Sequence, residues 1–191
     1  MNYFKRVFSI ANYKFLVKEL SLIQSDVAER CICASLKPFI EKEIQKNKKY
    51  QNYHVDVEYN RNAGHVKTII NDKEEIINIT CDLIVHSRGE NENYDNLLAL
   101  EMKKSYRSNE EKNQDRNRLI ALTKSTSTNE IWSYGEKTYP RHVCGYSLGI
   151  YYEIDLPNEI IIIEYYIQGK LVEKFEKKFI NVKKKKRRLS E

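Results

Sequence analysis

The chain lacks the sequence patterns that mark secreted, membrane-spanning or zinc-binding proteins. Its four cysteines form no C-x-x-C pair, and no spacing of histidine and cysteine resembles a zinc site. The apolar run Ile160–Ile163 is far too short to cross a bilayer, and Lys14 and Lys18 interrupt the N-terminal apolar segment where a secretory signal would continue. We therefore expect a cytoplasmic protein with free thiols and no membrane partner.

Proline and glycine are also scarce, with three and six residues respectively in a chain of 191. No Gly/Pro/Ser-rich linker and no internal repeat divides the sequence, so we expect a single domain over residues 1–182. A basic tail at residues 183–191 supplies much of the formal net charge of +6. Such a tail either grips a polyanion or is simply solvated, and the sequence leaves both interpretations open.

Hydrophobic periodicity predicts helices and strands in an order typical of an α/β protein. Helical spacing predicts a helix at about 27–46, which Pro38 should kink or split, and a second helix at 109–123. Residues 1–20 are expected to form a short strand or helix, and the polar segment 125–141 a long loop. Strands are expected at 53–59, 66–70, 76–80, 81–86, 97–104, 146–154 and 160–167, with a last strand or helix at 171–179. This order predicts an α/β sandwich around a mixed sheet.

The most informative feature is the placement of charge on two neighbouring apolar strands. Asp82 opens the first strand, and Glu101 and Lys103 lie two residues apart on the second. Side chains alternate faces along a strand, so Glu101 and Lys103 point the same way. Two carboxylates can hold a Mg²⁺ ion, with the backbone carbonyl of Met102 as a further ligand, and a lysine beside it can orient or deprotonate a water.

A bland alternative exists for the glutamate and the lysine. On a solvated edge strand, Glu101 and Lys103 would simply form ion pairs worth about 0.2–1 kcal/mol. Glu-x-Lys alone is a common and weak motif. The aspartate at the start of the preceding apolar strand favours the metal site over the surface ion pair.

The same residues carry a resemblance to a known family. The run Asp82-Leu-Ile-Val-His-Ser-Arg-Gly, followed after a loop by Asn96-Leu-Leu-Ala-Leu-Glu-Met-Lys-Lys-Ser, resembles the core of the PD-(D/E)XK nuclease superfamily. It is most similar to the small restriction-endonuclease-like proteins of bacteria. Further segments in the matching order are Glu29-Arg30, residues 55–61, residues 115–119 and residues 146–154. One departure is Cys81, which stands where the family has a proline that shapes the backbone.

The resemblance implies a fold, a cofactor and an activity. The fold would be a restriction-endonuclease-like three-layer sandwich, with a mixed central β-sheet flanked by helices. Asp82 and Glu101 would be metal ligands, Lys103 the catalytic lysine and Glu29 an auxiliary catalytic acid. The cofactor would be Mg²⁺, for which Mn²⁺ substitutes. The protein would be an endonuclease that hydrolyses phosphodiester bonds, of DNA more than of RNA, in defence against or maintenance of mobile DNA.

Several assignments keep a structural competitor at this point. Asp26 and Glu29 fit a capping box, in which Glu29 would serve the helix rather than a site. Asp115 and Arg118 on the second helix could support the residues of the site, but an exposed i,i+3 pair is the preferred interpretation. Phosphate contacts are predicted for Arg61, Arg88, Lys104 and Arg107, although an ordinary solvated surface explains any one of them nearly as well.

A second functional hypothesis comes from another class of protein. The fold could be kept as a catalytically silent module that binds nucleic acid or a protein partner, as a homodimer or as a subunit of a larger complex. The intact set of Asp82, Glu101 and Lys103 argues against a dead enzyme.

Overall fold

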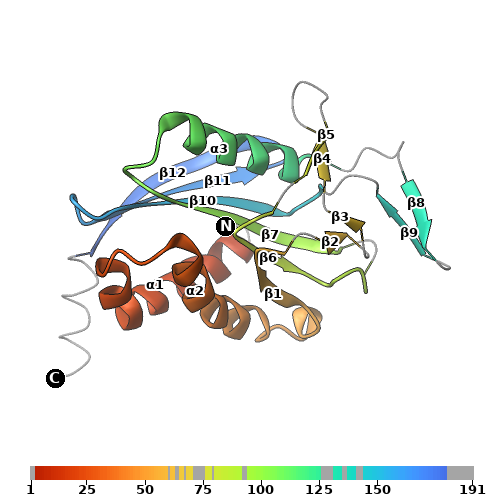
Figure 1. Cartoon of the computed structure of the whole chain (residues 1–191). Coiled ribbons are helices and arrows are strands. Elements are labelled where there is room, and N and C mark those ends of the chain that lie inside the picture. The colour runs from red at the N-terminus through yellow and green to blue at the C-terminus, as the bar shows by residue number, and fades with distance from the viewer. Residues whose placement is uncertain are drawn as a thin grey trace.

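A six-stranded mixed sheet forms the centre of the protein in the computed structural model (Figure 1). The structure describes residues 3–59, 80–91, 94–125 and 144–179, together with the backbone alone of six short strands in the remaining segments. The sheet has the order β1-β6-β7-β10-β11-β12, in which β7 and β10 are parallel and every other neighbouring pair is antiparallel. These strands are β1 (His54–Val57), β6 (Leu83–His86), β7 (Asn96–Lys104), β10 (Leu148–Asp155), β11 (Ile160–Ile167) and β12 (Lys170–Lys178).

Three helices cover the two faces of this sheet. The helices α1 (Tyr3–Gln24) and α2 (Glu29–Ile44) lie on one face, and α3 (Asn109–Thr123) lies on the other (Figure 1). A short 3₁₀ helix, η1 (Lys48–Tyr50), leads into β1. Three two-stranded hairpins complete the described backbone: β2 (Arg61–Asn62) with β3 (His65–Val66), β4 (Thr68–Ile70) with β5 (Ile76–Asn78), and β8 (Ile131–Tyr134) with β9 (Lys137–Pro140).

Each face of the sheet has its own apolar core, because strand side chains alternate between the two. The larger core, under α1 and α2, includes Leu83 of β6 and Leu100 of β7. The smaller core, under α3, includes Ile84 and Ala99 from the same strands. The prediction of an α/β sandwich with a mixed sheet is therefore confirmed, and odd-numbered positions of β7 around Glu101 face α3.

The helix α3 is fixed at its start and packed closely at its end. Ser108 and Glu111 form a capping box in which each side chain accepts a hydrogen bond from the other residue's backbone N–H, at 3.2 and 3.1 Å. Near the other end, a Cβ atom at Gly149 of β10 would lie 2.9 Å from Cγ2 of Thr123. The absence of a side chain at Gly149 therefore lets α3 lie directly on the sheet.

The element predictions were accurate where the periodicity was strong. The bounds predicted for α3 and β11 are those observed, the N-terminal segment is a helix and the last element is a strand. The helix predicted at 27–46 is α2, and Pro38 lies inside it without splitting it; Leu36 and Ile40 on either side are buried in the core. The long loop predicted at 125–141 was wrong, because β8 and β9 form a hairpin there. Within the described residues, no helix combines the length and apolarity needed to span a membrane.

Candidate active site

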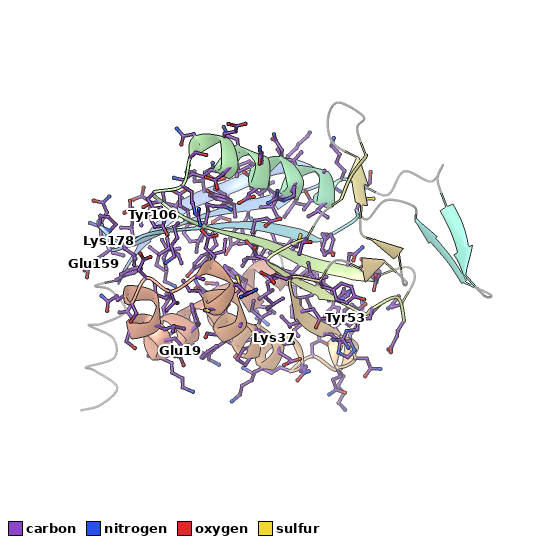
Figure 2. All side chains as sticks on the ribbon, viewed as in Figure 1. Glu19, Lys37, Tyr53, Tyr106, Glu159 and Lys178 are labelled. Carbon is purple, nitrogen blue, oxygen red and sulfur yellow. The ribbon has the colours of Figure 1, made fainter. Side chains whose placement is uncertain are left out.

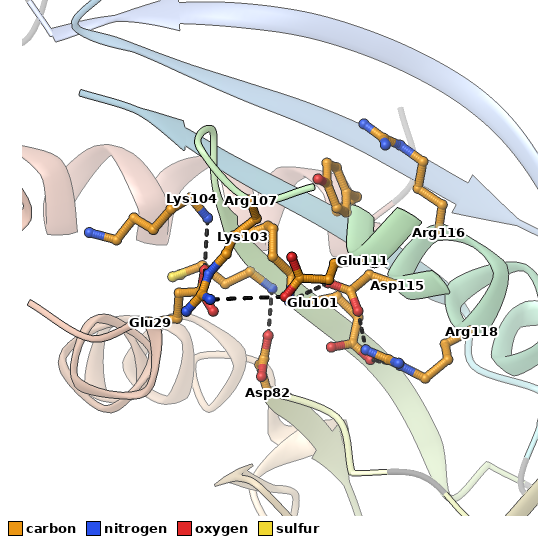
Figure 3. Close-up of polar contacts among 12 residues, drawn as sticks. Glu29, Asp82, Glu101, Lys103, Lys104, Arg107, Glu111, Asp115, Arg116 and Arg118 are labelled. Atoms are coloured by element: carbon orange, nitrogen blue, oxygen red, sulfur yellow. Dashed lines mark hydrogen bonds and ion pairs between the residues drawn. The ribbon is translucent and has the colours of Figure 1, made fainter. Parts of the chain in front are cut away.

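The register of β6 and β7 brings the two predicted carboxylates together. Leu83 pairs with Leu100 in this antiparallel ladder, so Asp82, one position earlier, lies beside Glu101. The backbone N–H of Met102 donates a 2.7 Å hydrogen bond to Oδ2 of Asp82 and fixes this carboxylate against β7 (Figure 3). Asp82, Glu101 and Lys103 therefore share the face of the sheet that α3 covers.

Two residues of α3 complete a charged cluster with these side chains. Lys103 Nζ lies 2.9 Å from Oδ2 of Asp115, and Arg118 Nε donates a 3.0 Å hydrogen bond to Oε1 of Glu101 (Figure 3). Asp115 and Arg118 also contact each other. The two residues do pair, but the preferred prediction that this pair is exposed was wrong, because Asp115 is only 2% exposed and the pair also contacts Lys103 and Glu101 of β7, as in the alternative interpretation. A signal was available, since both residues lie on the helix that directly follows the Glu-x-Lys strand.

Burial changes the acidity of both carboxyl groups. Burial raises the pKa of Glu101 to about 8, and the neighbouring charge of Asp82 adds to the effect while Arg118 opposes it. Burial likewise raises the pKa of Asp82 to about 6, against the opposing hydrogen bond from Met102. Burial alone would lower the pKa of Lys103, but the ion pair with Asp115 raises it above its usual value. The cluster thus pairs two carboxyl groups that resist ionisation with a lysine that keeps its proton.

A divalent cation bound between Asp82 and Glu101 would offset the cost of ionising these two buried carboxyl groups. A bound cation favours the ionised form of both groups, which burial disfavours. Among the residues that the structure describes, no three His, Cys, Asp or Glu side chains gather closely enough to form a ready-made metal site. A metal here would therefore rest on two carboxylates, the carbonyl of Met102 and several waters, a ligand set that suits Mg²⁺. The role of that carbonyl stays a prediction.

Glu29 approaches the same end of β7 from the other helical layer. Its Oε1 accepts a 2.8 Å hydrogen bond from the backbone N–H of Lys104, next to Lys103 (Figure 3). The competing capping box is wrong: the N-cap of α2 is Ala28, and no side chain caps it. The carboxylate of Asp26 instead contacts Lys104 Nζ at 2.6 Å. Glu29 is thus free of capping and borders the predicted site.

The predicted phosphate-binding residues fall into different environments. Lys104 is 2% exposed and its ammonium pairs with Asp26, so its burial argues against the phosphate contact predicted for it. Arg107 has a half-exposed side chain whose guanidinium lies 3.9 Å from Glu29. Arg88 is engaged by Asp56, and the side chain of Arg61 lies outside the described residues. Arg107 is the candidate that lies beside the cluster.

Arg88 and Asp56 form a separate charged contact near the β1 edge of the sheet. The guanidinium of Arg88 donates two hydrogen bonds to the Asp56 carboxylate, at 2.9 and 2.8 Å, and His86 Nε2 lies 3.1 Å from the same group. Burial alone would raise the pKa of Asp56, but these hydrogen bonds lower it to about 2. The carboxylate therefore contributes stability at neutral pH.

We expect Asp56→Asn to lower the free energy of unfolding by roughly 1–2 kcal/mol at neutral pH, a discounted value because Arg88 is half exposed and its attraction is screened. Since the folded pKa lies below the ordinary value, this contribution is present above about pH 4 and is lost as the pH falls through about 2. Urea denaturation of both proteins at several pH values measures it. Asp155→Asn is the control, because Asp155 lies at the partly exposed end of β10 and its carboxylate accepts hydrogen bonds from the neutral Asn158, and an Asp56→Asn effect that stayed constant down to the lowest pH would contradict the assignment.

A groove of about 420 Å³ lies elsewhere, between α1 and α2. Its lining includes Lys18 and Phe39, with the buried Glu43 at one side. All of its lining residues belong to the two helices on the face opposite Asp82 and Glu101. This groove is therefore separate from the carboxylate cluster.

Comparison of the chain with models of protein families, with curated proteins and with solved structures finds no match.

Proposed function

We propose that the protein is a metal-dependent nuclease with a restriction-endonuclease-like fold, which hydrolyses phosphodiester bonds in DNA. The observation that carries this proposal is the convergence of Asp82, Glu101 and Lys103 on one face of β6 and β7, with Glu29 at the end of β7. The order of elements supports it: a helix, an antiparallel β1-β6-β7 unit, the helix α3, and then β10 parallel to β7. A role in defence against or maintenance of mobile DNA rests on the resemblance alone.

In this proposal Asp82, Glu101 and the Met102 carbonyl would hold a Mg²⁺ ion, which supplies charge neutralisation at the phosphate and lowers the pKa of water. The protein's own groups provide orientation and a fixed positive charge. The Met102 N–H keeps the Asp82 carboxylate in place, and Arg118 does the same for Glu101. Lys103 carries its proton, because the pairing with Asp115 raises its pKa, so Nζ would donate a hydrogen bond where negative charge develops on the phosphate.

The direct test is incubation of the purified protein with single-stranded and duplex DNA and with RNA. We expect DNA cleavage with Mg²⁺ or Mn²⁺ and none after chelation. An absence of cleavage of every substrate with either metal would overturn the proposed activity.

Metal binding also predicts a thermal shift that does not depend on turnover. We expect Mn²⁺ at about a hundredfold excess over its Kd to stabilise the wild-type protein by about 2.7 kcal/mol, a rise in Tm of roughly 5–10 °C. Asp82→Asn should remove most of this shift, because one of the two carboxylates is lost, whereas Asp155→Asn should keep it. Equal Mn²⁺ shifts in the two variants would place the metal elsewhere.

One observation favours the second candidate function, a catalytically silent module that binds nucleic acid. Glu101 and Lys103 are both already engaged, by Arg118 and Asp115 respectively. In a silent module, Glu101, Lys103, Arg118 and Asp115 would serve only to form these two ion pairs, which hold α3 on the sheet. Salt-dependent DNA binding without metal-dependent cleavage would support that alternative.

A further inference from the structure

The turn between β7 and α3 presents an exposed aromatic side chain beside the candidate site. Tyr106 is 67% exposed, more than any other large hydrophobic residue recorded as exposed in the described part of the chain. It lies three residues after Lys103, in the segment that connects β7 to α3. Figure 2 shows Tyr106 at the opposite end of the molecule from Tyr53. No buried core requires an aromatic ring at this position.

Hydrogen bonds on both sides of Tyr106 hold the turn in one conformation. The N–H of Ser105 donates to the carbonyl of Ile154 at 2.9 Å, and the N–H of Arg107 donates to the carbonyl of Lys104 at 3.1 Å. Lys112 Nζ also donates to the Ser105 carbonyl, at 2.6 Å. A ring on a fixed turn loses little conformational freedom on binding, so its contact area converts efficiently into affinity.

Arg107 connects this ring to the charged cluster. The centre of its guanidinium lies 5.7 Å from the ring centroid of Tyr106, and its Nε lies 3.9 Å from the Glu29 carboxylate. The side chain is about half exposed, at 45%. An aromatic face and a solvent-accessible guanidinium, one residue apart, match the base and the phosphate of one nucleotide.

We propose that Tyr106 and Arg107 form a subsite for an unpaired nucleotide next to the scissile phosphate, with the base stacked on Tyr106 and a phosphate held by Arg107. This inference rests on the proposed nuclease function and names the substrate class as single-stranded nucleic acid, or a duplex with an unpaired end. Bases inside a duplex are already stacked on their neighbours, so only an unpaired base offers its face to a protein ring.

The test measures binding of the full-length protein, in chelator, to a fluorescein-labelled oligothymidine strand and to its duplex with oligoadenosine. We expect Tyr106→Ala to weaken single-strand binding roughly 5- to 100-fold and to leave duplex binding unchanged, while Tyr106→Phe keeps wild-type affinity. Tyr94→Ala is the matched control, because Tyr94 is also exposed, at 51%, but lies away from the candidate site. The hydroxyl of Tyr53 donates a hydrogen bond to the backbone carbonyl of Tyr94. Thermal melting checks that all variants are folded.

The subsite is overturned if Tyr106→Ala binds the single strand like the wild type, if it weakens both substrates equally, or if the wild type binds neither. Parallel cleavage assays separate this result from the fate of the proposed activity. If the wild type and Tyr106→Ala cleave equally and bind equally, the subsite is contradicted and the nuclease activity is not. Tyr106-dependent binding without cleavage in Mg²⁺ or Mn²⁺ keeps the subsite and removes the nuclease.

Discussion

Replacing Lys103 by methionine is expected to lower metal-dependent DNA cleavage by roughly 10²–10³-fold, the usual cost of losing one donor aimed at developing charge. Methionine keeps most of the volume of the lysine side chain and removes only its charge and hydrogen bonds. The loss should appear in kcat more than in KM, because the ammonium would act on charge that develops in the transition state. Single-turnover cleavage with saturating Mn²⁺ measures the chemical step directly.

The chain offers a closely matched control in Lys112. This second lysine belongs to α3 itself, and its Nζ contacts Glu153 of β10 at 2.8 Å, much as Lys103 of β7 contacts Asp115 of α3 at 2.9 Å. The two side chains are 10% and 15% exposed. Lys112→Met removes a comparable ion pair together with the hydrogen bond to the Ser105 carbonyl, so its effect should appear in DNA affinity, whereas the single-turnover rate at saturating DNA should stay within the range of the wild type, because Arg116 still holds α3 on the sheet. Equal losses in the two variants would mean that Lys103 serves only to hold α3.

The features that could be predicted from the sequence are those set by local pattern. The alternation of β7 placed Glu101 and Lys103 on one face, and helical spacing defined α3. The same alternation carried a warning about Lys104, because the residue after Lys103 must point to the other face, where Asp26 meets it. Charge beside a motif was therefore a poor guide to phosphate contact.

The features that could not be predicted depend on contacts distant in sequence. The Asp-x-x-Glu pattern at Asp26 and Glu29 has the sequence of a capping box, but Asp26 has a positive φ of 52° and its carboxylate serves Lys104, far along the chain. The choice between two roles for Asp115 and Arg118 of α3 likewise depended on contacts with another element. The polar residues of this helix suggested a solvated surface, whereas Asp115 and Arg118 contact the charged strand.

Two further ion pairs between α3 and the sheet fix the position of this helix, and with it the contacts of Asp115 and Arg118. Lys112 contacts Glu153 of β10, and Arg116 contacts Glu164 of β11 through two hydrogen bonds of 2.9 and 3.1 Å. Both carboxylates are buried and lie on the face of the sheet that carries Glu101. Because paired buried charges are directional, they hold α3 in one position on the sheet. The placement of Asp115 and Arg118 against β7 follows from that anchoring.

Removing Arg118 should cost more stability than any other single change at the cluster. Breaking a buried pair costs roughly 3–5 kcal/mol when the remaining carboxylate stays ionised, but Glu101, which is 1% exposed and has a pKa of about 8, takes up a proton at lower pH, so Arg118→Ala approaches this cost only well above pH 8. In that range the Tm should fall by about 10 °C for a chain of this size. Asp115 keeps Lys103 as a partner, so the effect should come mainly from Glu101. The double variant Glu101→Gln/Arg118→Ala should recover most of the loss, because its buried group at position 101 is neutral.

The pH dependence of this loss follows from the sign of the pKa shift. In the wild-type fold the pKa of Glu101 is raised from 4.5 to about 8, so stability is lost as the pH rises through that interval. Without Arg118 the folded pKa rises further, because that cation opposes the effect of burial. The Tm difference between wild type and Arg118→Ala should therefore be small near about pH 6, where Glu101 is protonated in both proteins, and much larger near about pH 9, and it should lose this dependence in the double variant. A difference that was equal at both pH values would show that Arg118 stabilises the fold by packing rather than by holding the charge of Glu101.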